Sequence, residues 1–67
     1  MYDFIIEVQN KSKTFVKRFD SKEKASQNLK ELESFIEDCK VKNLKPTIKD
    51  DRRKHCLITN YYIEEVA

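Results

Sequence analysis

The stretch that decides the fold runs from Asp20 to Lys40 and reads DSKEKASQNLKELESFIEDCK. Its apolar positions are Ala25, Leu29, Leu32, Ile36 and Cys39. They recur in alternating steps of four and three residues, which is the spacing of one face of an α-helix. Asp20 is predicted to cap the start of this helix, with Glu23 three residues later completing a capping box. The pattern predicts one amphipathic helix whose apolar face packs on strands from both flanks.

Two strands are predicted before this helix. Residues 2–9 and 13–19 alternate between apolar and polar side chains, which is the period of a β-strand. A two-residue turn at Asn10 and Lys11 gives the pairs Ile5–Val16, Ile6–Phe15, Tyr2–Phe19 and Asp3–Arg18. This register matches apolar with apolar residues on both faces, so the segment is predicted to form a β-hairpin.

Two further strands are predicted after the helix. Asn43 suits the left-handed residue that ends a helix, and Pro46 rules out helical continuation. Residues 44–49 are predicted as a short edge strand, because Pro46 lacks a backbone donor. Residues 55–63, HCLITNYYI, are rich in β-branched and aromatic residues and are predicted as a long strand.

The second hairpin fixes which side chains share a face. A turn centred on Arg52 and Arg53 pairs Ile48 with Leu57. That register places five residues on one face, namely Leu44, Pro46, Leu57, Tyr61 and Ile63. It places three residues on the other face, namely Cys56, Ile58 and Tyr62.

The element order predicts an α+β fold of two layers. The order ββαββ gives a four-stranded, mainly antiparallel sheet with the amphipathic helix packed on one face. The first and last strands are the most apolar and are expected in the centre of the sheet. With 67 residues, the chain is expected to form one small domain over residues 1–67.

The composition excludes several classes of binding site. The chain has no glycine, so a P-loop, a dinucleotide-binding turn and a GXXG clamp are all excluded. Backbone positions with positive φ are expected at asparagine instead, with Asn10, Asn43 and Asn60 as candidates.

An enzyme is not expected. The single histidine, His55, precedes Cys56, and neighbours on a strand point to opposite faces, so they cannot form a thiolate–imidazole pair. With Cys39 they supply only three soft ligands, one short of a structural zinc set. We therefore expect no catalytic residue, no metal site, no cofactor and no small-molecule substrate.

The cellular setting is predicted from cysteine usage and hydropathy. The two cysteines lack the spacing of a disulfide framework, so free buried thiols are expected. No apolar segment reaches membrane-spanning length, and we expect a cytoplasmic protein without membrane association. Lysine outnumbers arginine and tryptophan is absent, which favours a small accessory or inhibitory protein of bacterial or phage origin.

Charge is distributed unevenly along the chain. The net charge is only +2, yet the segment from Lys40 to His55 carries seven cations and two acids. The segment from Asp20 to Cys39 carries three cations and six acids. A nucleic acid, if bound, would therefore contact the basic hairpin rather than the helix. The residues of that alternative site are Lys49, Arg52, Arg53 and Lys54.

A protein partner is the leading expectation. The predicted registers direct four apolar residues to the sheet face that one helix leaves uncovered, namely Ile5, Val16, Ile58 and Tyr62. An uncovered sheet face should carry polar side chains, so an apolar cluster there indicates a binding surface. The prediction is a non-catalytic protein–protein interaction module, perhaps a homodimer, that uses this face or the acidic back of the helix.

Overall fold

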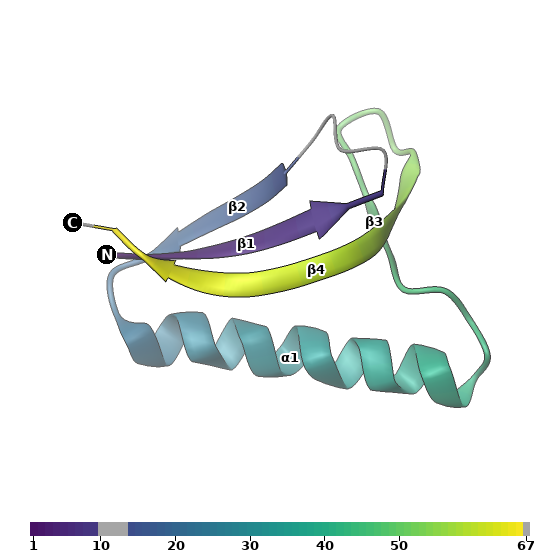
Figure 1. Ribbon diagram of the computed structural model, residues 1–67, viewed down its shortest axis with the longest axis horizontal. Coiled ribbons are helices and arrows are strands. Elements are labelled where there is room, and N and C mark those ends of the chain that lie inside the picture. The colour runs from purple at the N-terminus through teal and green to yellow at the C-terminus, as the bar shows by residue number, and fades with distance from the viewer. Residues whose placement is uncertain (10–13, 67) are drawn as a thin grey trace.

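The computed structural model describes residues 1–9 and 14–66. The elements are β1 (Tyr2–Val8), β2 (Thr14–Phe19), α1 (Lys22–Val41), β3 (Thr47–Lys49) and β4 (His55–Glu65). All strand pairs are antiparallel, and the sheet order is β2-β1-β4-β3. Helix α1 lies along one side of the sheet (Figure 1). The predicted ββαββ architecture of the α+β class is confirmed, as are the central positions of the first and last strands.

The first hairpin has the predicted register. Ile5 lies opposite Val16, Ile6 opposite Phe15 and Asp3 opposite Arg18. The alternation therefore assigns each side chain to the predicted face of the sheet. The predicted turn at Asn10 and Lys11 lies outside the described residues.

Helix α1 begins one residue later than predicted. The cap is Ser21, whose Oγ accepts a hydrogen bond from the backbone N–H of Lys24 at 3.3 Å. Serine and aspartate cap helices about equally well, so the apolar pattern could not choose between neighbours. With Ser21 as the cap, Lys24 rather than Glu23 occupies the third helical position, and the predicted capping box is wrong. Asp20 instead accepts an ion pair from Lys24 Nζ at 3.1 Å.

The helix ends where predicted. Lys42 is the C-cap, and Asn43 follows with φ of 60°. The N–H of Leu44 donates to the carbonyl of Cys39 at 2.8 Å, and the N–H of Asn43 donates to that of Lys40 at 3.1 Å. These two bonds form a Schellman motif, in which asparagine takes the left-handed position that glycine usually fills.

The core lies between α1 and the two central strands. Ala25 is fully buried at the start of the helix, and Cys39 is 7% exposed near its end. The strands contribute Phe4, Ile6, Val8 and Ile58, against which Leu29, Leu32 and Ile36 pack. Among the described residues, no large side chain is completely buried. The core is thin, as expected for a domain of this size.

The turn between β3 and β4 differs from the predicted one. Arg53 has φ of 60°, and the N–H of Arg53 donates to the carbonyl of Asp50 at 3.0 Å. The N–H of Asp50 donates to the carbonyl of Lys54, also at 3.0 Å. This is a three-residue loop closed by a left-handed residue, not a two-residue turn. Ile48 therefore lies opposite Cys56, and the predicted pairing of Ile48 with Leu57 is wrong.

A β-bulge in β4 overturns the predicted position of Ile58. Glu7 lies opposite Asn60, but Val8 lies opposite Ile58, so Thr59 is an extra residue in β4. An extra residue reverses the alternation of side chains beyond it. Ile58 therefore faces α1, is 8% exposed and belongs to the core. For the same reason Cys56 packs toward the core, and Leu57 does not share a face with Tyr61.

Candidate functional site

The sheet face opposite α1 carries nine residues that the strand registers bring into three rows across β2, β1 and β4. We call these nine residues the open face. Its first row is Arg18, Asp3 and Glu64, its middle row is Val16, Ile5 and Tyr62, and its third row is Thr14, Glu7 and Asn60.

The middle row is apolar across all three strands. Ile5 lies directly opposite Val16 on one side and Tyr62 on the other. Such neighbours have Cβ atoms about 4.5–5.5 Å apart. Ile5 is only 7% exposed, whereas Val16 is 56% exposed and Tyr62 is 38% exposed. Ile5 thus forms the floor between two accessible apolar side chains, and three of the four predicted binding residues do lie together.

The first row contains a bidentate ion pair. Arg18 Nε donates to Asp3 Oδ1 at 2.8 Å, and Arg18 Nη2 donates to Asp3 Oδ2 at 3.0 Å. The hydrogen bond from Arg18 holds the pKa of Asp3 below its ordinary value of 3.8. Asp3 is among the buried residues, while the Arg18 side chain remains half exposed. This row fixes one border of the apolar row with a rigid, charge-assisted contact.

The lowered pKa of Asp3 predicts a specific loss of stability in acid. A carboxyl whose folded pKa is lowered stabilises the fold above its unfolded pKa and loses that contribution as the pH falls through the folded value. We expect Asp3→Asn to be less stable than the wild type at pH 7, with a shallower fall in stability below about pH 4. Urea unfolding measured from pH 2 to pH 7 tests this.

Asp20→Asn is the matched control. Asp20 also has a lowered pKa, through its hydrogen bond with Lys24, but both side chains are more than half exposed. Solvent screening makes such a pair weak, so this variant should follow the wild-type acid profile. Equal acid profiles for Asp3→Asn and the wild type would contradict the role given to the Asp3–Arg18 pair.

The third row is polar and reaches back to the tyrosine. Asn60 Nδ2 donates to Glu7 Oε1 at 3.2 Å, and the Tyr62 hydroxyl donates to Glu7 Oε2 at 3.5 Å. Burial raises the pKa of Tyr62, and the nearby carboxylates of Glu7 and Glu64 raise it further. These contacts orient the Tyr62 ring beside Ile5. The sequence did not predict them, because they depend on the bulge at Thr59.

The alternative site is the tip of the β3–β4 hairpin. Arg52, Arg53 and Lys54 are all exposed there, and Lys49 is exposed at the end of β3. The Asp50 carboxylate shapes the tip, since its Oδ1 accepts from the N–H groups of Arg52 at 2.8 Å and Lys54 at 2.9 Å. The predicted basic residues therefore do lie on one protruding loop.

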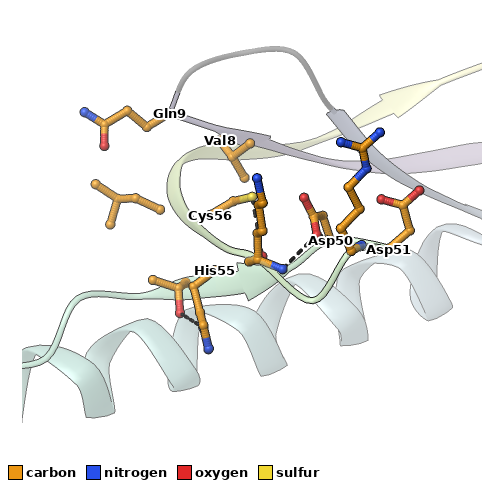
Figure 2. A pocket seen from close by; sticks show the side chains of 10 residues that line it. Val8, Gln9, Asp50, Asp51, His55 and Cys56 are labelled. Carbon is orange, nitrogen blue, oxygen red and sulfur yellow. Dashed lines mark hydrogen bonds between the residues drawn. The ribbon is translucent and has the colours of Figure 1, made fainter.

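An open hollow of about 670 Å³ lies beside this hairpin. Figure 2 shows Val8 and Gln9 at the end of β1 on one side and Asp50 and Asp51 at the turn on another. Thr47 Oγ1 and His55 Nδ1 are hydrogen bonded at its wall, 3.2 Å apart. The lining mixes both signs of charge, so it does not present a uniform surface to a phosphate chain.

The two cysteines are free thiols, as predicted. Cys39 is buried under the helix, whereas Cys56 is half-buried and lines the hollow. Within residues 1–9 and 14–66, no group of three or more His, Cys, Asp or Glu side chains is placed to hold a metal ion.

The back of α1 is acidic, as the sequence predicted. The exposed carboxylates there are Glu31, Glu33, Glu37 and Asp38. Phe35, on the same helix, is 44% exposed. No described helix combines the length and the hydropathy needed to cross a membrane. Comparisons with protein-family models, with curated proteins and with solved structures each return no match.

Proposed function

We propose that the protein is a non-catalytic binding module that docks a partner protein on its open face. The observation that carries this proposal is the apolar row of Val16, Ile5 and Tyr62, which crosses three adjoining strands on the side away from α1. The uncovered face of an antiparallel sheet is ordinarily polar. Apolar residues gathered across neighbouring strands are instead the pattern of a docking surface.

The arrangement around the apolar row supports a protein partner. The row is bordered on both sides by charged or hydrogen-bonded residues, and an apolar centre with a polar rim is the usual anatomy of a protein interface. The nine residues carry three carboxylates and one guanidinium, a net charge of −2. The best partner surface would place an apolar side chain against Val16 and Tyr62 and basic groups near Glu7 and Glu64.

Binding of nucleic acid through the basic hairpin is the second candidate. It is favoured by the exposure of Arg52, Arg53 and Lys54 on one protruding loop, because clustered cations attract phosphates. The two aspartates of the same loop weaken that attraction, so we rank this function below protein binding.

Tyr62→Ala should abolish most of the partner binding. Tyrosines at the centre of an interface often contribute 2 kcal/mol or more, so we expect the dissociation constant to rise about 30-fold. The matched control is Phe35→Ala, which removes a similarly exposed aromatic ring from the helix side. Partners captured from the source cell by the wild type are then titrated against both variants by calorimetry.

Three results would argue against the open face. Equal affinities for Tyr62→Ala and the wild type would exclude it as the docking surface. A loss of binding caused by Phe35→Ala alone would move the interface to α1. A salt-dependent gel shift of duplex DNA or RNA, lost when Arg52 and Arg53 are both changed to glutamine, would favour the second candidate.

A further inference from the structure

We infer that two copies of the protein pair through their β2 strands, in antiparallel register about a two-fold axis that passes beside Val16. The two four-stranded sheets would then form one continuous sheet of eight strands. This inference goes beyond the proposed function and does not depend on it, since the open face could bind a partner in either a monomer or a dimer.

The two edges of the sheet differ in how open they are. β3 is three residues long and is preceded by Pro46, and both features discourage strand addition. β2 is six residues long and contains neither proline nor a bulge. Within the described residues it pairs with β1 alone. The edge of β2 is therefore the one on which a strand can be added.

The side chains of β2 also favour a further strand. Val16 is 56% exposed on the open face, and Phe15 and Phe19 are only half-buried on the helix side. Of the two cations, Arg18 is held by Asp3, and Lys17 Nζ lies 5.5 Å from the centre of the Phe19 ring. A neighbouring strand would cover apolar side chains without burying an unpaired charge.

The sequence of β2 selects a single register for pairing with itself. A two-fold axis perpendicular to the sheet keeps the faces aligned, so only residues of the same face can oppose each other. Registers centred on Val16 or on Lys17 overlap five residues, and the registers one step further out overlap only three. Centring on Lys17 sets two lysines directly opposite each other, which is unfavourable. Centring on Val16 avoids this.

The register centred on Val16 is favourable on both faces. On the open face it sets Val16 against its own copy, and Thr14 against Arg18 of the second copy. On the helix side it sets Phe15 against Lys17 of the second copy. The apolar rows of the two copies then join end to end in the order Tyr62, Ile5, Val16, Val16, Ile5, Tyr62. Because β3 closes both outer edges, the assembly stops at two copies.

Disulfide trapping tests this register. Cα atoms of directly opposed residues lie about 4.5–5.5 Å apart, within reach of a disulfide. Val16→Cys should therefore cross-link to its own copy on mild oxidation. In this register the two copies of residue 17 are roughly 8 Å apart, and those of residue 14 are further still, beyond disulfide reach. Lys17→Cys and Thr14→Cys are thus matched controls that should cross-link at least about tenfold more slowly.

The links are located by mass spectrometry of the digested protein, and oxidised wild type accounts for links through the two native cysteines. Sedimentation of the reduced wild type should give a dimer. Val16→Glu, which opposes two carboxylates, should raise the dimer dissociation constant about fivefold or more while the circular dichroism spectrum stays unchanged.

Several results would overturn the inference. A monomeric wild type at millimolar concentration would exclude the dimer. Faster linkage at residue 17 than at residue 16 would indicate the other register. A wild-type dimer that neither cross-links through Val16→Cys nor weakens with Val16→Glu would place the contact elsewhere on the molecule.

Discussion

Ile58→Glu is expected to unfold the protein. Ile58 is 8% exposed and packs with Phe4, Ile6 and Val8 beneath α1. Removing a buried isoleucine side chain alone costs about 2–5 kcal/mol, and an unpaired buried carboxylate adds to that cost. A domain of this length has a stability of only about 3–10 kcal/mol. The far-ultraviolet circular dichroism spectrum should therefore lose its helical signal at 25 °C.

Val16→Glu is the matched control for this substitution. Both residues are β-branched and lie on strands, and the sequence pattern assigned both to the uncovered face. Val16 is 56% exposed, so its carboxylate remains hydrated and the variant should keep the wild-type spectrum. A folded Ile58→Glu variant would mean that β4 has no bulge at Thr59 and that Ile58 faces solvent.

The misplacement of Ile58 has a definite physical origin. A strand pattern has a period of two, so one extra residue exchanges the faces of everything beyond it. Thr59 is that residue, and its Oγ1 donates to the carbonyl of Glu7 at 3.3 Å. Threonine is common in regular strands, so its type did not reveal the bulge. The alternation was right for Tyr61 to Ile63 and wrong for Cys56 to Ile58.

The hairpin turn was misjudged for a related reason. The left-handed position of this loop normally holds glycine, and the chain has none. Asparagine was the expected substitute, and it does take that conformation at Asn43. At the hairpin the position falls to Arg53 instead, where the side chain of Asp50 holds the backbone of Arg52 and Lys54. The residue type of Arg53 alone carried no signal for this.

The parts that could be predicted are those where two independent constraints agree. In the first hairpin, the alternation of both strands and the matching of both faces permit one register, and that register gave the Ile5–Val16 contact and the opposed Asp3 and Arg18. The helix is similar, because its apolar stripe and its C-terminal asparagine indicate the same boundaries. Three of the four residues predicted for the open face were correct because their positions follow from the part of the sheet without irregularities.

The open face and the inferred dimer address one weakness of the domain, its thin core. Phe15 and Phe19 stay half-buried at the free edge, and Val16 and Tyr62 stay accessible on the open face. Apolar area that remains exposed contributes nothing to the stability of an isolated copy. A neighbouring strand and a docked partner would each bury part of it, so association would stabilise the fold.

Phe4→Ala should cause the largest loss of stability among the aromatic residues. Phe4 is 5% exposed at the centre of β1, where it packs in the core with Ile6 and Val8. Removing a buried phenylalanine ring costs about 3–5 kcal/mol, because transfer energy is lost and a cavity remains. Urea unfolding followed by circular dichroism should show a lower midpoint at an unchanged slope.

Phe35→Ala makes the same chemical change at a residue that is 44% exposed on α1. Little packing is lost there, and alanine favours the helix, so we expect a change within about 1 kcal/mol. Both variants must be compared with the wild type at one protein concentration, because a dimer makes apparent stability depend on concentration. Equal losses for Phe4→Ala and Phe35→Ala would show that α1 packs on the sheet through a different face. A loss confined to Phe4→Ala supports the core between α1, β1 and β4, and with it the assignment of the opposite side of the sheet as the open face.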